Sequence, residues 1–334
     1  MKNFQLVTLK FVLIAMCFCA PVALAQNTIS AADPSIRQGQ QKAEKGNLVG
    51  ALADFSQAVA LDPQSANAYF GRGNVNYALG KKQAALDDFN QAIKRNPGLA
   101  AAYGNRGNTR DDLGDNQGAI DDYTQALKLE PRNALTYFNR GLTRRELGDF
   151  QGAISDFSQS IKLNPNYAPA YNSRGLARQA VGDKQGALTD FNQAIKREPR
   201  SAVSYYNRGN LYYGQEDRLN AIADFDQAIK LDPNFLPAYV GRGNAYDDLG
   251  KKQAALSDYD KAIKGDPNFA NAYYNRGIAR FNAGDRQGAL ADYDQAIRLN
   301  PKSAEMYNSR AILRRALGDE PGATEDLQKA AQLN

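Results

Sequence analysis

Apolar residues in this chain recur at helical spacing, in short stretches that are separated by turn residues. From Tyr69 to Leu79, positions three and four residues apart fall near one face, which predicts an amphipathic helix. A cleaner apolar stripe from Ala85 to Ile93 predicts a second helix. Between the two stands Gly80, and glycine readily takes the left-handed conformation of a helix end. This stretch therefore predicts two helices joined by a turn.

The predicted helix pair recurs with a period of 34 residues along almost the whole chain. A fixed period of this length is typical of stacked, similar units, each of which buries its apolar face against its neighbours. The chain is therefore predicted to be an all-α solenoid of about nine helix-turn-helix repeats. The clearest marker of the period is a proline, which cannot continue the second helix of each unit, at Pro63, Pro97, Pro131, Pro165, Pro199, Pro233, Pro267 and Pro301.

Each unit also carries aromatic and small residues at fixed positions, as in Tyr69, Gly73, Ala85, Phe89, Ala92 and Pro97. This pattern resembles the tetratricopeptide repeat. The resemblance implies a right-handed superhelix with a concave groove that is lined by the first helix of each unit. Members of the family bind peptides or partner proteins there and are rarely catalysts. The resemblance covers residues 32–334, as repeats 32–65, 66–99, 100–133, 134–167, 168–201, 202–235, 236–269, 270–303 and 304–334.

The chain departs from the commonest form of the repeat at two positions. Arginine stands where the family usually has leucine, and aspartate precedes the second-helix aromatic where the family often has tyrosine. We expect an ion pair between the two helices, because a planar guanidinium can hold a carboxylate with two bonds. Whether the pair lies within or between repeats stays open, and a ligand-binding ladder of arginines is the alternative. The arginines are Arg72, Arg106, Arg140, Arg174, Arg208, Arg242, Arg276 and Arg310, and the aspartates are Asp54, Asp88, Asp122, Asp156, Asp190, Asp224, Asp258, Asp292 and Asp326.

The N-terminal segment follows a different pattern. Residues 1–25 contain two lysines, an apolar run from Phe11 to Phe18 and the sequence Ala23-Leu24-Ala25. These features predict a secretory signal peptide that is cleaved after Ala25, followed by a short linker at 26–31. The apolar run is short for a stable membrane span. We therefore expect an exported chain, periplasmic or secreted, with no stable span after cleavage; an uncleaved anchor is the alternative.

Composition excludes several kinds of active site. The chain has no histidine and no tryptophan, and its two cysteines, Cys17 and Cys19, both lie in the predicted signal peptide. Ser-His-Asp and Cys-His mechanisms and histidine-containing zinc sites are therefore excluded from the mature chain. Acidic pairs such as Asp111-Asp112 could in principle support glycoside hydrolysis, but sequence neighbours on a helix do not face each other. We expect no enzyme, no cofactor and no metal.

Charge adds little to this picture. Lysine and arginine total 41 against 36 acidic residues, and loss of Lys2 and Lys10 with the signal lowers the net charge from +5 to +3. Such a mild excess is not a nucleic-acid footprint, so we expect no nucleic-acid partner. Further first-helix arginines, such as Arg110, Arg144 and Arg178, are interpreted as solvated or paired charges.

We expect partner recognition at first-helix positions where the repeats differ from one another. Amides present a donor and an acceptor together, which suits the backbone of an extended peptide, and tyrosine supplies contact area at low entropic cost. A protein or peptide partner is the favoured interpretation, and an envelope glycan or an accessory role in the cell envelope is the alternative. For any single aromatic, packing between repeats is the competing explanation. The candidate residues are Phe70, Asn74, Tyr77, Asn105, Asn108, Phe138, Asn139, Arg145, Tyr206, Asn210, Tyr213, Asn244, Tyr274, Asn275 and Phe281.

Overall fold

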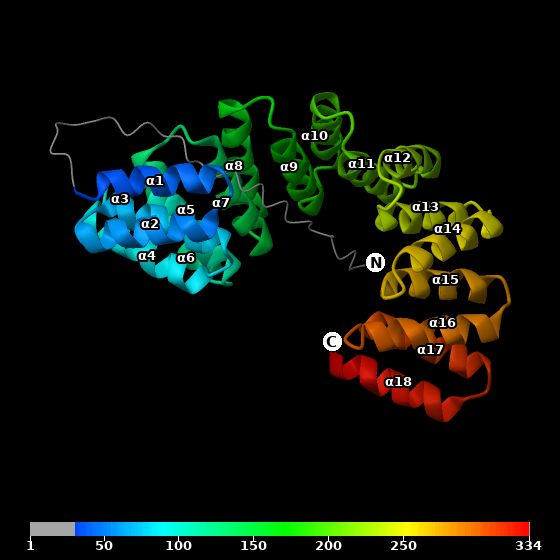
Figure 1. Cartoon of the computed structure of the whole chain (residues 1–334). Coiled ribbons are helices and arrows are strands. Elements are labelled where there is room, and N and C mark those ends of the chain that lie inside the picture. Colours follow the sequence, from blue (N-terminus) through cyan, green and yellow to red (C-terminus); the bar gives the residue numbers. More distant parts are fainter. Residues whose placement is uncertain (1–30, 334) are drawn as a thin grey trace. The chain divides into compact units, whose positions relative to one another are not determined.

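The structure is a computed structural model that describes residues 31–333 (Figure 1). Over this range the chain forms 18 α-helices and no strand, so the predicted all-helical repeat fold is confirmed. The predicted signal peptide, residues 1–25, lies outside the described residues.

The chain divides into two compact units, one ending at Thr143 and the other beginning at Arg144, within α7 (Ala134–Glu146). The first unit contains α1 (Asp33–Glu44), α2 (Leu48–Leu61), α3 (Ala66–Ala78), α4 (Lys82–Arg95), α5 (Ala100–Asp112) and α6 (Asn116–Leu129). The second unit contains α8 (Phe150–Leu163), α9 (Ala168–Ala180), α10 (Lys184–Arg197), α11 (Ala202–Gly214), α12 (Arg218–Leu231), α13 (Leu236–Asp248), α14 (Lys252–Gly265), α15 (Ala270–Asn282), α16 (Arg286–Leu299), α17 (Ala304–Ala316) and α18 (Glu320–Leu333).

Helices pack in sequential order inside each unit. In the first unit α1 packs on α2, α3 on α4 and α5 on α6, and the same pairing continues from α9 to α18 in the second (Figure 1). The first helices of neighbouring repeats also touch, as α3 touches α5 and α11 touches α13. First helices of adjacent repeats therefore contact one another in both units, which places their side chains next to those of the adjacent repeat.

Turn chemistry explains where the helices begin and end. In most repeats an aspartate caps the second helix; the Asp183 side chain, for example, accepts a hydrogen bond from the backbone N–H of Gly186. The residue that ends the first-helix turn has a positive φ, as at Gly182, where φ is 85°. In the sixth repeat this place is held by Glu216, at φ 65°. Glutamate carries a steric penalty in this conformation that glycine does not.

The core of each repeat depends on a close approach between its two helices. Phe89 is 1% exposed, and a Cβ added to Gly73 would lie 2.7 Å from the Cε1 atom of its ring. The small residue on the first helix therefore makes room for the second-helix aromatic. In the last repeat Leu327 replaces this aromatic and is 40% exposed, which suits the end of a stack.

Candidate functional site

The recurring arginines bind the recurring aspartates inside a single repeat. In the fifth repeat, Nε and Nη2 of Arg174 donate to the two carboxylate oxygens of Asp190 at 2.9 and 2.7 Å, and the Asp190 side chain is 1% exposed. Such two-bond, charge-assisted pairs fix both distance and orientation. The same contact joins Arg72 to Asp88, Arg106 to Asp122, Arg208 to Asp224, Arg242 to Asp258, Arg276 to Asp292 and Arg310 to Asp326. The sequence alone left this choice open.

The remaining nitrogen of the guanidinium reaches the second helix of the preceding repeat. Arg174 Nη1 donates to Ser158 Oγ at 3.0 Å, and Arg242 Nη1 donates to Asp226 Oδ1 at 2.5 Å. The Arg174 guanidinium also lies 5.7 Å from the centroid of the Tyr171 ring, within cation–π range. Because these arginines contact protein groups within and between repeats, a scaffold role explains them better than a ligand-binding ladder does.

A second arginine on the first helix supports the same carboxylate. Arg178 Nη1 donates to Asp190 Oδ2 at 2.9 Å, and Arg110, Arg144, Arg280 and Arg314 make the equivalent contact in their repeats. In the first repeat Gln38 replaces the recurring arginine, and Lys42 pairs with Asp54 at 2.8 Å instead. The first-helix arginines that make these contacts are therefore paired charges.

In the first unit, several candidate residues contact one another across repeats. Asn105 Nδ2 donates to Asn74 Oδ1 at 2.7 Å, and Asn139 Nδ2 donates to Asn108 Oδ1 at 2.9 Å. Tyr77 donates its hydroxyl to Asp112 Oδ2 at 2.7 Å. The structure thus places five of the polar candidates in three separate inter-repeat contacts on α3, α5 and α7.

The two phenylalanine candidates of the first unit mainly pack. The Phe70 ring lies 6.1 Å from that of Phe89, and Phe138 is only 7% exposed. Arg145, on the part of α7 that belongs to the second unit, is half-buried, and burial lowers the pKa of its guanidinium. Whether these three residues bind a partner stays a prediction.

The second unit repeats part of this arrangement. Tyr213 is hydrogen-bonded to Asp248, and burial together with that bond raises the pKa of Tyr213 to about 12. Asn244 Oδ1 accepts a hydrogen bond from the Tyr259 hydroxyl at 2.8 Å. The Tyr206 ring lies 5.2 Å from that of Phe235, edge to face.

The remaining candidates of the second unit lie on α11 and α15. Asn210 is hydrogen-bonded to Tyr206. The hydroxyl groups of Tyr274 and Ser309 are 2.9 Å apart, and Asn275 Nδ2 donates to Asn271 O at 2.8 Å. Phe281 is half-buried against the core of the last two repeats. The candidates therefore form a row of local contacts along the first helices and no single enclosed pocket.

Asp112 and Asp248 are the residues that sequence reasoning did not select. Each accepts the tyrosine hydroxyl of the repeat before it, through a contact that spans 35 residues for Tyr77 and Asp112. In the sequence, this contact could have been found as a tyrosine followed 35 residues later by an aspartate, which is one repeat plus one residue.

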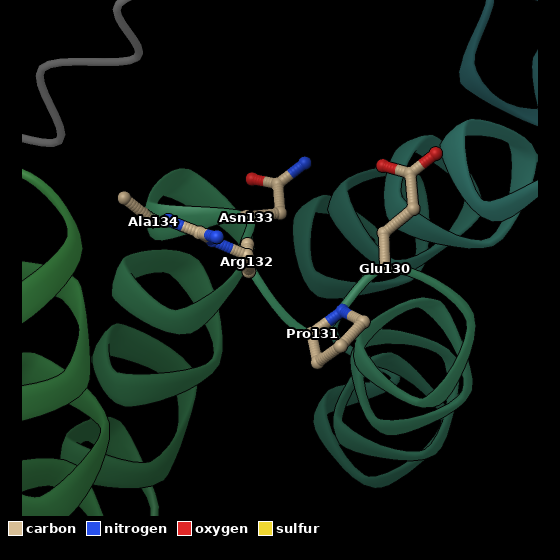
Figure 2. Close-up of a pocket in the computed structure, with 5 residues that line it drawn as sticks. All are labelled: Glu130, Pro131, Arg132, Asn133 and Ala134. Atoms are coloured by element: carbon tan, nitrogen blue, oxygen red, sulfur yellow. The ribbon is translucent and has the colours of Figure 1, made fainter.

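A shallow depression lies at the turn between α6 and α7. It is lined by Glu130, Pro131, Arg132, Asn133 and Ala134, and none of these is a candidate residue (Figure 2). Figure 2 shows the side chains of Glu130 and Asn133 projecting outward from the turn. Asn133 also caps α7, because its Oδ1 accepts the backbone N–H of Thr136. The depression is formed by the turn itself, and its lining residues do not point toward a common reactive group.

Within residues 31–333, no group of three or more acidic, cysteine or histidine side chains is placed to hold a metal ion. Over the same part of the chain, no helix combines the length and the apolar character that crossing a membrane requires.

A family model described as the tetratricopeptide repeat matches residues 66–99, 100–133, 134–167, 202–235 and 270–303, which is more than half of the chain. A second tetratricopeptide model matches residues 39–80 and 243–284. The chain belongs to the tetratricopeptide repeat family. Proteins of this family bind protein or peptide partners, and their fold is typically a non-enzymatic scaffold.

Solved structures show the same fold. A tetratricopeptide repeat protein from Parabacteroides merdae is similar with a TM-score of 0.59 and 22% identity, over 74% of this chain and 98% of that protein. The APC/C hetero-tetramer Cut9-Hcn1 gives a TM-score of 0.58 at 15% identity, over 90% of this chain and 56% of the other. Pseudomonas aeruginosa pilF gives 0.55 at 20% identity, over 62% and 94%. At these identities the likeness concerns the fold alone. No curated protein sequence matches this tetratricopeptide chain significantly.

Proposed function

We propose that this tetratricopeptide chain is an exported scaffold that binds a polypeptide along its first helices. The proposal is supported by the family, whose members bind protein or peptide partners. It is also supported by the structure of the repeat. The recurring Arg–Asp pairs, such as Arg174 with Asp190, join the two helices of a repeat, which leaves the other first-helix side chains for contact with a partner.

One observation carries the proposal. From the second repeat to the ninth, the first-helix position of Asn74 is held by asparagine, leucine or isoleucine, whereas the position of Arg72 is arginine in each of these repeats. Because the scaffold residues stay constant while this position varies, the side chain at this position can differ according to the partner that it contacts. Asn74, Leu176 and Ile278, at this varying position, are half-buried, so each also presents surface outward.

Export is the second part of the proposal and rests on residues 1–25. The segment has basic residues, an apolar run and an Ala-x-Ala end, which together are typical of a secretory signal. The mature protein then begins at Gln26. The intact mass of the protein recovered from its source organism should match a chain that starts at this residue, and a mass that includes residues 1–25 would contradict cleavage.

The binding proposal is tested by site-specific photo-cross-linking in the source organism. A photoreactive amino acid placed at Asn275, on the face of α15, should capture a protein partner. The matched control is Lys162, an exposed residue on the second helix α8, where we expect no specific capture. Equal capture at both sites would contradict a first-helix binding face, and capture of saccharide without protein would favour a glycan ligand instead.

A further inference from the structure

The first-helix face carries the same pattern twice. At the position of Asn74, the eight repeats from the second to the ninth have two asparagines, two leucines, two asparagines and two isoleucines. In chain order these are Asn74, Asn108, Leu142, Leu176, Asn210, Asn244, Ile278 and Ile312. Pairs of neighbouring repeats are therefore alike, and a polar pair is followed by an apolar pair in each half of the series.

In one repeat of each polar pair, the asparagine accepts a hydrogen bond from a tyrosine on the second helix. Asn108 Oδ1 accepts from the Tyr123 hydroxyl at 2.9 Å, and Asn244 Oδ1 accepts from the Tyr259 hydroxyl at 2.8 Å. Repeats with leucine at this position have phenylalanine opposite instead, in the combinations Leu142 with Phe157 and Leu176 with Phe191. The scaffold therefore accommodates an apolar combination here, and stacking of repeats does not require the polar one.

Carboxylates occur at equivalent places in both polar pairs. Tyr77 donates to Asp112 at 2.7 Å, and Lys82 Nζ lies 3.5 Å from the same carboxylate. Four repeats later, Tyr213 is hydrogen-bonded to Asp248, and Arg218 Nε lies 2.6 Å from that carboxylate.

A second aspartate precedes each of these carboxylates, as Asp111 and Asp247. Burial and the neighbouring Asp248 raise the pKa of Asp247. The two clusters thus agree in their tyrosine, carboxylates, cation and asparagines, although each lies wholly within its own unit.

We infer that the binding face contains two equivalent half-sites for the same peptide segment. The first half-site consists of Asn74, Tyr77, Asn108, Asp111 and Asp112, and the second consists of Asn210, Tyr213, Asn244, Asp247 and Asp248. The inference rests on the proposed function, because it specifies how the first-helix face would bind a polypeptide.

The chemistry of the half-sites defines the segment that fits them. Ionised carboxylates only accept hydrogen bonds, and asparagine can both donate and accept. Each half-site carries two carboxylates beside one cation, Lys82 or Arg218, so negative charge predominates. The matching segment is extended and rich in donors, such as amide side chains, lysine or arginine, with backbone N–H groups turned toward the asparagines.

The repeats themselves supply substitutions that replace the amides of one half-site by an apolar combination that other repeats already carry. The first-site variant N74L/N108L/Y123F copies the leucine and phenylalanine of repeats four and five. The second-site variant N210L/N244L/Y259F makes the same change in the second unit. The control variant L176I introduces the residue that repeats eight and nine carry at this position. Circular dichroism melting should show that all three variants are folded.

The probe is a synthetic peptide selected from a random phage-displayed library on the mature wild-type chain. Isothermal titration calorimetry should then give two peptides per chain for the wild type and for L176I. Each half-site variant should bind one peptide per chain. A variant with both sets of changes should bind none, and the heat that it releases should be at least tenfold smaller than that of the wild type. Together these counts would establish two equivalent sites.

Two outcomes separate this inference from the proposed function. A selected peptide that binds wild type once, or that binds the half-site variants with unchanged stoichiometry, would overturn the two-site inference and leave peptide binding intact. A library that yields no peptide above the background of an unrelated protein would contradict peptide binding itself, and the inference with it.

Discussion

Asp190 is the most stringent test of the scaffold argument. Its carboxylate is 1% exposed and accepts hydrogen bonds from Arg174 at 2.9 and 2.7 Å and from Arg178 at 2.9 Å. The substitution Asp190→Ala leaves two guanidinium groups facing a buried space without their anion. Removal of one partner of a buried ion pair costs about 3–5 kcal/mol.

The expected loss lies at the lower end of that range. The Arg174 and Arg178 side chains remain 15% and 25% exposed, so both can recover some hydration after the change. We therefore expect Asp190→Ala to lower the free energy of unfolding by about 3 kcal/mol. Urea is the denaturant of choice, because it does not screen charges, and far-UV circular dichroism reports the loss of helix.

Two further variants make the result interpretable. Thr189→Ala changes an exposed neighbour on α10 and should alter stability by no more than about 0.5 kcal/mol. The triple variant Asp190→Leu, Arg174→Leu and Arg178→Leu removes all three charges and should recover most of the loss, because well-packed apolar residues often replace a buried ion pair at little cost. A stability of Asp190→Ala within about 0.5 kcal/mol of wild type would refute the reasoning.

Three other changes follow from local geometry. Glu216→Gly removes a side chain from a position with φ 65° and should raise the free energy of unfolding by about 1 kcal/mol in the same urea assay. Gly73→Ala places a Cβ 2.7 Å from the Phe89 ring and should destabilise by about 1–3 kcal/mol. Tyr213 should ionise near pH 12, because its pKa is raised from 10.0 to about 12; its contribution to stability is complete below pH 10 and is lost as the pH rises toward 12. Ultraviolet difference titration of wild type against Asp248→Asn should show a lower tyrosine pKa in the variant.

Each of these predictions can fail in a recognisable way. A destabilised Glu216→Gly variant would mean that the glutamate side chain contributes more than its backbone conformation costs. Gly80→Ala is the comparison for Gly73→Ala, because no atom lies within 4 Å of a Cβ added at Gly80. The φ of 74° at Gly80 strains an alanine. Both variants should therefore be destabilised, Gly80→Ala by backbone strain and Gly73→Ala by the clash with Phe89. An unchanged tyrosine titration in Asp248→Asn would remove Asp248 as a cause of the shift.

The sequence was sufficient for the fold because the same signals recur in most repeats. A periodic tyrosine, glycine, aromatic and proline leave little freedom in the choice of element, and the structure begins first helices at Ala66, Ala100 and Ala202. The sequence alone could not show which contacts of Arg174 lie within its repeat, for a simple geometric reason. Asp190 and Ser158 both lie 16 residues from Arg174, in opposite directions along the chain. Only the stacking of repeats shows that one contact is internal and the other reaches the preceding repeat.

The candidate site was harder to predict than the scaffold. Contacts such as Tyr77 with Asp112 depend on how far one first helix is shifted and rotated against the next, and a spacing of 35 residues becomes a contact only through that geometry. The same uncertainty explains why Phe138 could be proposed for binding although it is 7% exposed. Aromatic residues at helical spacing serve packing and recognition equally well, so their burial had to come from the structure.

The Arg–Asp network also explains why the first-helix face can vary between repeats. Arg106 bonds to Asp122 in its own repeat and to Asn90 in the preceding one, so it fixes the repeat on both sides without involving the face that carries Asn108. Asparagine, leucine and isoleucine can therefore alternate at that position under one scaffold. If the network were instead the binding surface, its residues would be expected to differ between repeats as the face does. The constancy of the arginines and the paired alternation beside them thus support the same division: the network holds the repeats in register, and the first-helix face is where we propose that a partner binds.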